Sequence, residues 1–217
     1  MRVVCISDTH GLHEQVTLPP GDLLVHAGDV SRRGTREQVR TFLEWFASRP
    51  HPHKLLVAGN HDFLFQKDPA AARALVPPGV TYLEDEAATV AGLRVWGSPW
   101  TPEFFDWAFM LERGAPLAAR WAAIPDGLDL LITHGPPYGH GDQAVPLGGV
   151  SGDARAVGCI ELLQAVRRAR PRVHVFGHIH EGHGVTVSDE ARGTRFVNAA
   201  ICTVDYRPVN PPLVVDL

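Results

Sequence analysis

The stretch Val3-Val4-Cys5-Ile6-Ser7-Asp8-Thr9-His10 sets an apolar run just before a carboxylate and an imidazole. Runs rich in β-branched residues favour strands. Similar apolar runs recur along the chain, at residues 23–26, 54–58, 93–96, 128–133, 172–176, 195–198 and 213–215. We expect each run to form a strand, the last one at a sheet edge because Pro208, Pro211 and Pro212 precede it.

Two longer stretches have the periodicity of amphipathic helices. Residues 36–48 repeat apolar side chains at helical spacing, and residues 154–170 do the same among charged residues, with Asp153 as the expected N-cap. Strands that alternate with helices favour a layered α/β architecture with a buried sheet. The spacing alone leaves the strand order open.

Four more polar motifs follow apolar runs in the same way as Asp8 and His10. They are Gly28-Asp29, Gly59-Asn60-His61-Asp62, Thr133-His134-Gly135 and Gly177-His178-Ile179-His180. Carboxylate, imidazole and amide groups are ligands for divalent cations, and in α/β sheets the loops after the strands converge. A bridging carboxylate would hold two cations roughly 3.5–4 Å apart, which suits hydrolysis of phosphate esters.

The order of these motifs resembles the calcineurin-like metallophosphoesterases, whose pattern runs D-x-H, G-D, G-N-H-[D/E], a single H and G-H-x-H. Further segments, such as Val175-Phe-Gly-His-Ile-His-Glu-Gly and Asn210-Pro-Pro, are similar to the animal fetal-brain subfamily. The resemblance spans nearly the whole chain. It implies a layered metallophosphoesterase fold, a β-sandwich core flanked by helices, in a single domain over residues 1–217.

The resemblance also implies two metal sites. One would be formed by Asp8, His10, Asp29 and His180, and the other by Asp29, Asn60, His134 and His178, with Asp29 as the bridge. His61 matches the non-ligating histidine that approaches the phosphate together with Asn60 and aids the leaving group, and we expect Asp62 to orient it. The ligand set favours Mn²⁺, with Fe, Zn²⁺ and Co²⁺ as alternatives.

Composition narrows the substrate and the location. The chain has 217 residues, a formal net charge of -4 and no run of Lys or Arg, which disfavours a surface for long nucleic acid. Cys5, Cys159 and Cys202 suggest neither a disulfide framework nor a zinc site, and no stretch approaches membrane-spanning length. We expect a cytoplasmic protein with a small phosphodiester or nucleotide substrate.

The preferred function is therefore a binuclear phosphodiesterase in which a metal-bridging hydroxide attacks small phosphodiesters, with cyclic nucleotides among the candidates. A phosphomonoesterase or protein phosphatase is the enzymatic alternative. A scaffold or nucleotide sensor is the non-catalytic one, and the complete ligand set counts against it. A nuclease is disfavoured by the missing basic stripe.

Several residues outside the motifs have two interpretations. We expect His26 and His174 to support the sheet or the ligands, and His13, His51, His53 and His183 to lie in loops or at the surface. His140 and Asp142 could contact substrate within the glycine-rich segment 136–152. The aromatic segment 100–109 favours a packed flap or a self-association surface, as in a homodimer, over stacking on a nucleobase.

Overall fold

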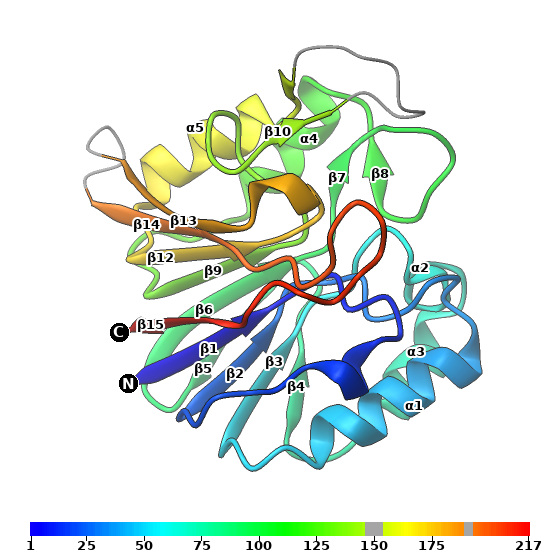
Figure 1. Cartoon of the computed structure of the whole chain (residues 1–217). Coiled ribbons are helices and arrows are strands. Elements are labelled where there is room, and N and C mark those ends of the chain that lie inside the picture. Colours follow the sequence, from blue (N-terminus) through cyan, green and yellow to red (C-terminus); the bar gives the residue numbers. More distant parts are fainter. Residues whose placement is uncertain (146–153, 189–192) are drawn as a thin grey trace.

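The computed structural model describes residues 1–145, 154–188 and 193–217. It contains a five-stranded and a six-stranded sheet (Figure 1). The five-stranded sheet has the order β15-β1-β2-β3-β4, with β1 Arg2–Ile6, β2 Leu23–His26, β3 His53–Leu56, β4 Val80–Tyr82 and β15 Leu213–Asp216. The six-stranded sheet has the order β13-β14-β12-β9-β6-β5, with β5 Glu86–Val90, β6 Leu93–Ser98, β9 Leu130–Thr133, β12 Val173–Phe176, β13 Gly184–Ser188 and β14 Thr194–Asn198. In both sheets the central strands pair in parallel, whereas β15, β5 and β13 pair antiparallel at the edges.

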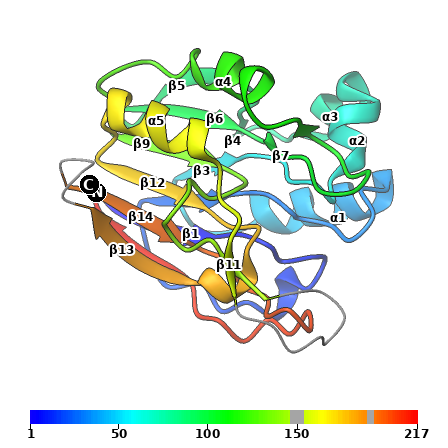
Figure 2. The same ribbon diagram turned by 90° about the horizontal axis from the view of Figure 1, so that it is seen from above.

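Helices cover the outer face of each sheet (Figure 2). Those on the five-stranded sheet are α1 Arg36–Ala47, α2 Phe63–Lys67 and α3 Pro69–Leu75, and those on the six-stranded sheet are α4 Ala115–Trp121 and α5 Ile160–Ala169. The short elements are η1 His13–Gln15, β7 Thr101–Pro102, β8 Met110–Leu111, β10 Gln143–Ala144, β11 Arg155–Ala156 and η2 His180–Gly182. No helix in the described part of the chain combines the length and the apolar character that a membrane crossing needs.

The alternation of side chains along the strands produces these layers. In β1, Val3 and Cys5 pack into the apolar layer between the two sheets, while Val4 and Ile6 pack against the helices on the other side. Every one of these four side chains is fully buried. A strand covered on both faces is apolar throughout, which is why these runs are continuous and not alternating.

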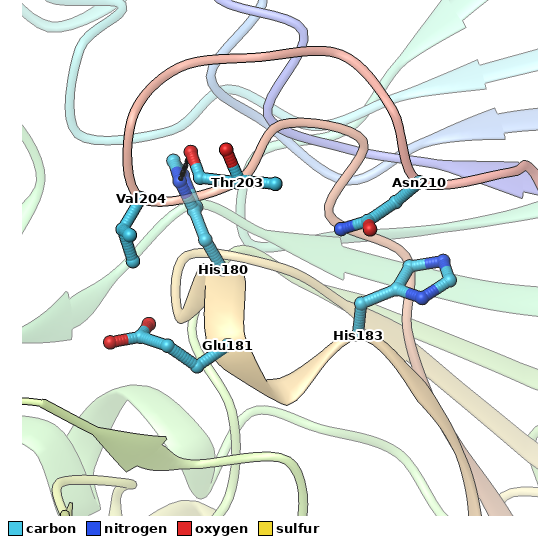
Figure 3. Close-up of a pocket in the computed structure, with 6 residues that line it drawn as sticks. All are labelled: His180, Glu181, His183, Thr203, Val204 and Asn210. Atoms are coloured by element: carbon cyan, nitrogen blue, oxygen red, sulfur yellow. Dashed lines mark hydrogen bonds between the residues drawn. The ribbon is translucent and has the colours of Figure 1, made fainter.

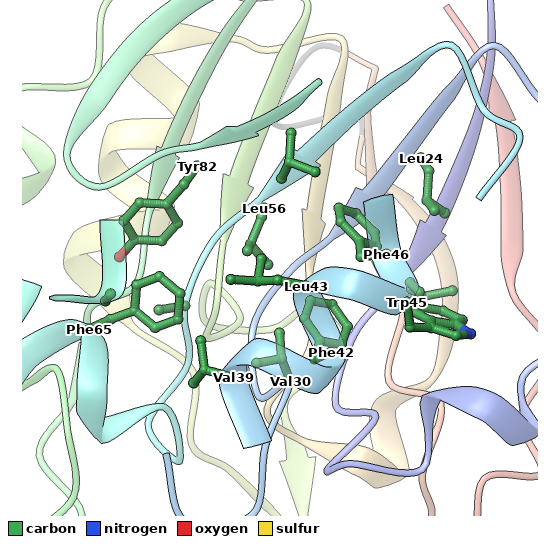
Figure 4. Close-up of a cluster of buried hydrophobic side chains, with 14 of the residues drawn as sticks. Leu24, Val30, Val39, Phe42, Leu43, Trp45, Phe46, Leu56, Phe65 and Tyr82 are labelled. Carbon is green, nitrogen blue, oxygen red and sulfur yellow. The ribbon is translucent and has the colours of Figure 1, made fainter. Parts of the chain in front are cut away.

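Helix α1 shows how the outer layer is fixed. Thr35 caps its first turn by accepting a hydrogen bond from the Gln38 N–H at 3.3 Å. The rings of Phe42 and Phe46 stack, with 5.3 Å between their centroids, in the cluster of buried side chains that the helix shares with the five-stranded sheet (Figure 4). A threonine cap of this kind contributes about 1 kcal/mol, and burial of each phenyl ring contributes more. The helix is thereby held against β1, β2 and β3, the strands that precede Asp8, Asp29 and Asn60.

The sandwich flanked by helices and all the expected strands are confirmed, with ends shifted by a few residues at most, and β15 is an edge strand. The expected helix over residues 154–170 is wrong in its first turns. Arg155–Ala156 pairs with Gln143–Ala144, and the helix begins at Ile160 with Cys159 as its cap. Asp153, the expected cap, lies outside the described residues.

Candidate metal centre

Three of the expected ligands follow neighbouring parallel strands of the five-stranded sheet. Asp8 comes shortly after β1, Asp29 after β2 and Asn60 after β3. The carboxyl ends of parallel strands lie along one edge, so these loops meet. Backbone hydrogen bonds join the first two loops, from Asp8 N–H to Gly28 and from His10 N–H to Asp29.

The remaining ligands come from the six-stranded sheet. His134 follows β9 directly, His178 follows β12, and His180 opens η2. The two loops are joined by a hydrogen bond from the Gly177 N–H to the His134 carbonyl at 2.9 Å. The expected centre is therefore assembled across the sandwich, with ligands from both sheets.

Asp8, His10 and His180 form the first group of candidate ligands. Their ligand atoms all lie within 4.8 Å of one another. The Nε2 atoms of His10 and His180 are 3.2 Å apart, and Asp8 Oδ1 lies 3.5 Å from His180 Nε2. Ligands bound at about 2.1 Å around one ion have such mutual separations.

Asn60, His134 and His178 form the second group. The Oδ1 atom of Asn60 lies 2.9 Å from His134 Nε2 and 2.9 Å from His178 Nδ1. One amide oxygen and two imidazole nitrogens thus converge on a single point. This amide–imidazole group has the donor chemistry of a divalent-metal site.

Asp29 lies between the two groups. Its Oδ2 atom is 3.8 Å from His10 Nε2 in the first group and 3.5 Å from His134 Nε2 in the second. Its other oxygen accepts a hydrogen bond from the His61 N–H at 2.8 Å. A single carboxylate oxygen therefore faces both ligand sets, which is the arrangement that a bridging ligand needs.

The hydrogen bonds made by Nδ1 of His134 and of His180 show whether their Nε2 atoms are free to bind a metal ion. Nδ1–H of His134 donates to the Ala27 carbonyl, and Nδ1–H of His180 donates to the Thr203 carbonyl, both at 2.9 Å. A carbonyl only accepts, so each neutral ring has its lone pair on Nε2, which faces the other ligands. This tautomer is the one that binds metal.

The local charges also fit a cation. Burial raises the pKa values of Asp8 and Asp29, but the neighbouring histidines outweigh burial and hold both carboxyls well below their usual range. Burial similarly lowers the pKa of His134, yet the Asp29 charge raises it to about 9. Burial lowers the pKa of His178 to about 3. Without metal, the negative charges of Asp29 and Asp8 therefore keep a proton on His134. A divalent cation that binds this ring would have to displace that proton.

Four candidate ligands have a positive backbone φ angle, in the left-handed region that residues other than glycine rarely adopt. The φ angles are 53° at Asp8, 45° at His10, 57° at Asp29 and 68° at His178. Such residues are uncommon and cluster at functional sites, where the surrounding structure holds them. The backbone of these loops therefore adopts an uncommon conformation at the residues whose side chains form the candidate site.

Glycines in two motifs allow the close approach of ligand loops. Gly28 has a φ of 108°, and an added Cβ would meet the imidazole of His134. At Gly177 a Cβ would overlap the carboxylate of Asp8. These glycines leave the space that the neighbouring ligands occupy, which explains their place in the motifs.

His61 stands at the edge of the centre, with 12% of its side chain exposed. Its Nδ1–H donates to the Arg32 carbonyl at 2.9 Å, and its Nε2 lies 3.9 Å from Asp29 Oδ2. The ring of His61 is therefore oriented by the backbone carbonyl of Arg32 and not by the Asp62 side chain that we expected.

Asp62 instead joins two ligand loops. Its buried carboxylate accepts hydrogen bonds from the backbone N–H groups of Val30, Ser31 and Gly59 and from the Ser31 hydroxyl, at 2.7–3.1 Å. It therefore sets the position of Asp29 and Asn60 through their neighbours in the chain.

His26 and His174 support ligand loops. Nδ1 of His26 accepts from the Gly28 N–H, so its Nε2–H faces the Thr9 hydroxyl at 3.0 Å, between the ligands of the first motif. His174 Nε2 lies 2.8 Å from the Thr133 hydroxyl, next to His134. Both rings are fully buried. Each histidine thus contacts a threonine beside a candidate ligand.

Other residues differ from the expectation. His13 and His51 lie outside the strands and the longer helices, but both are buried, at 3% and 2% exposure, so neither is a surface residue. The aromatic contacts of His13 with α1 explain its burial. Asp142 accepts hydrogen bonds from the Gly139 and Gly158 N–H groups and so shapes its own loop. His140 stacks on Phe196 at 3.8 Å, and residues 146–152 of this segment lie outside the described part.

A hollow of about 290 Å³ lies behind His180 (Figure 3). Its wall includes Glu181, His183, Thr203 and Asn210. The Nδ1 side of His180 is bonded to Thr203, whereas Nε2 faces Asp8 and His10. His180 is the one candidate ligand among the described residues that line this hollow.

Sequence reasoning missed residues of the loop between β14 and β15. The carbonyl of Thr203 orients His180, and Tyr206 lies 4.8 Å from the ring of His10 between centroids. Asn210-Pro-Pro in this loop carries part of the resemblance, but no motif includes Thr203 or Tyr206. The loop reaches the centre because the Ile201 N–H donates to the Ser7 carbonyl beside Asp8 and because β15 pairs with β1 (Figure 1).

Comparisons with known proteins agree with this geometry. The family model described as calcineurin-like phosphoesterase matches residues 1–182. The human metallophosphoesterase domain-containing protein 1 is 43% identical over the whole chain and 71% of its own length, and the mouse protein matches equally well. A Caenorhabditis elegans UPF0046 protein is 35% identical over the whole chain and 60% of its own length.

A solved structure shows the same fold. TT1561 of Thermus thermophilus aligns with a TM-score of 0.61 over 91% of this chain and 88% of that one, at 14% identity. The motifs, the sandwich and the converging ligands thus agree with the family match over most of the sequence. The chain belongs to the calcineurin-like phosphoesterase family.

Proposed function

We propose that this chain hydrolyses small phosphodiesters, with cyclic nucleotides among the candidates, at a centre of two divalent metal ions, of which Mn²⁺ is preferred. The observation that carries the proposal is the position of Asp29 Oδ2, which lies 3.8 Å from His10 Nε2 and 3.5 Å from His134 Nε2. One ligand atom shared by two sets supports a binuclear site over a single ion.

The residues divide into two sets with one shared member. Asp8, His10, Asp29 and His180 would hold one ion, and Asp29, Asn60, His134 and His178 the other. When bound, the ions neutralise the phosphoryl oxygens and lower the pKa of a water nucleophile.

His61 is suited to act on the leaving group. The Arg32 carbonyl fixes the proton on Nδ1, so Nε2 is the atom that can exchange a proton with a substrate. The ring is partly exposed and lies beside Asp29, where an ester oxygen can reach it. A protonated His61 would donate to the departing oxygen, a step that contributes most when the leaving group is a poor one. Asn60 stands next to it and would contact the same phosphate.

The decisive experiment compares bis(p-nitrophenyl) phosphate with p-nitrophenyl phosphate, using metal-stripped protein titrated with Mn²⁺. We expect turnover to require metal and to favour the diester. Preference for the monoester would replace the diesterase by a phosphomonoesterase. Two bound ions without turnover on either ester would support a non-catalytic role.

The proposal also covers the setting of the enzyme. The three cysteines are all buried and unpaired, in line with a reducing cytoplasm. Phe104 and Phe105 are 48% and 69% exposed, which supports self-association of the single-domain chain as a homodimer. Sedimentation of the wild type and of a Phe105→Ser variant tests this point, since the variant should sediment as a monomer.

A further inference from the structure

Tyr206 stands between solvent and the candidate metal ligands. Its ring lies 4.8 Å from the ring of His10 and 5.8 Å from that of His180, between centroids. It nevertheless remains 37% exposed. A side chain that contacts two candidate ligands and is still this exposed lines the candidate metal site and does not belong to the hydrophobic core.

The backbone of Tyr206 indicates that its side chain is needed there. Its φ is 56°, a conformation that is unfavourable for an aromatic residue and easy for glycine or asparagine. The turn is closed by its N–H, which donates to the Thr203 carbonyl at 2.8 Å, and the same carbonyl accepts from Nδ1–H of His180. The loop that carries Tyr206 is thus fixed to a candidate ligand.

Trp107 supplies a second aromatic surface. Its ring is 4.3 Å from that of His61, at an interplanar angle of 35°, and it is half-buried. The adjacent Ala108 N–H donates to the Asn60 carbonyl at 3.1 Å, which anchors the segment to a ligand loop. The ring of Tyr206 lies 6.3 Å from His61, so two aromatic residues from distant parts of the chain approach the same histidine.

Arg32 adds a positive charge at this edge. Its guanidinium carbon lies 5.2 Å from the centre of the Tyr206 ring, while its carbonyl holds His61. The side chain is exposed. A guanidinium both stacks on flat rings and pairs with phosphate oxygens, so it complements a flat anionic substrate.

We propose that Tyr206, Trp107 and Arg32 form a recognition rim for phosphate esters that carry a flat π-bearing group, a nucleobase or an aryl ring. The flat group stacks on the aromatic side chains while the phosphate reaches the metal centre. This inference rests on the proposed function and specifies its substrate class. It makes Tyr206 a specificity-determining residue.

The first test measures binding without turnover. Calorimetry on the metal-loaded protein compares adenosine 5′-monophosphate with ribose 5-phosphate, which lacks the base, and phenyl phosphate with methyl phosphate. We expect the flat group to tighten binding about tenfold. Tyr206→Leu and Trp107→Leu should each remove most of that preference, Tyr206→Phe should keep it, and Phe105→Leu, at an exposed aromatic that packs on Phe104, serves as the control.

The outcomes separate the rim from the proposed function. A preference for the base alone identifies a nucleotide site, and equal preferences identify a general aryl site; both support the rim. Unchanged preference in Tyr206→Leu and Trp107→Leu overturns it, as does loss of bound metal in step with loss of preference. A wild type that binds the base but hydrolyses no ester keeps the rim and overturns the phosphodiesterase. A wild type that hydrolyses diesters but binds esters with and without a flat group equally well keeps the phosphodiesterase and overturns the rim.

Discussion

Substitution of Asp62 should destabilise the chain severely although Asp62 is not itself a candidate ligand. Its carboxylate accepts three backbone N–H groups and one hydroxyl at 2.7–3.1 Å, and it is fully buried. Burial, followed by the negative charge of Asp29, raises its pKa to about 6. At pH 8 it is therefore an ionised acceptor of four hydrogen bonds.

The magnitude follows from the donors that are left behind. Asp62→Ala leaves four buried donors without their acceptor, which costs about 3–5 kcal/mol. Asp62→Asn keeps the shape and removes the buried charge that the raised pKa disfavours, but it turns an amide NH₂ toward two of these donors, so its net loss should be smaller than that of the alanine variant. Natural domains are stable by about 5–15 kcal/mol, so the alanine variant loses a large share of that margin.

Urea unfolding of the metal-free proteins at pH 8 measures the effect. A loss of about 3 kcal/mol, at a slope of about 3 kcal/mol per molar urea, lowers the midpoint by about 1 M. The matched control is Asp68→Asn, at an exposed helix cap that accepts a hydrogen bond from the Ala71 N–H, with an expected loss below about 1 kcal/mol. An Asp62→Ala midpoint equal to that of the control would refute the reasoning.

Three further outcomes are expected. Asp29→Ala should bind neither ion tightly, because one substitution removes a ligand from both sets. The metal content is measured by mass spectrometry, with the exposed Asp126→Ala variant as the control. Two ions retained in Asp29→Ala would contradict the role of Asp29 as a bridge. His61→Ala should keep both ions and hydrolyse alkyl diesters far more slowly than aryl diesters, and an undiminished alkyl rate would exclude the proton donor. Burial, and then the charge of His140, lowers the pKa of His174 to about 3, below the value of about 6.5 in the unfolded chain. The contribution of His174 to stability is therefore complete above pH 6.5, and the free energy of unfolding falls by about 1.4 kcal/mol per pH unit as the pH drops toward 3. In His174→Gln this fall of the unfolding free energy with pH should be smaller by that amount, and an unchanged fall would contradict the assignment.

The strands and the ligands could be predicted because their signals are local. An apolar run marks each buried strand, and a polar motif follows at its carboxyl end. Short helices such as α2 Phe63–Lys67 and α4 Ala115–Trp121 have too few turns for a periodic pattern, so the sequence did not predict them. The start of α5 depends on a pairing between residues 143–144 and 155–156 that no local pattern reveals.

Features set by tertiary contacts could not be predicted from the sequence. His13 is buried because α1 lies over it, and Asp62 turns toward Val30 and Ser31, more than thirty residues away. The left-handed backbone at His178 was not predicted, because it accompanies a long-range contact in which the His178 N–H donates to the Asp8 carboxylate at 3.0 Å. Likewise, Tyr206 reaches the centre through long-range contacts of its loop, such as the hydrogen bond from the Ile201 N–H to the Ser7 carbonyl and the pairing of β15 with β1.

The seam between the two sheets has a consequence for the spacing of the two sets of candidate ligands. Asp29 follows a strand of one sheet and His134 follows a strand of the other, so their contact of 3.5 Å crosses the seam. A small slip of one sheet past the other would change this contact directly. Apolar side chains between the sheets, such as Val25 and Ile132, oppose the slip because a close-packed interior hardly compresses. That inner layer therefore fixes the distance between the two sets of candidate ligands. We expect that enlarging or trimming its side chains alters metal preference, although none of these side chains is itself a candidate ligand.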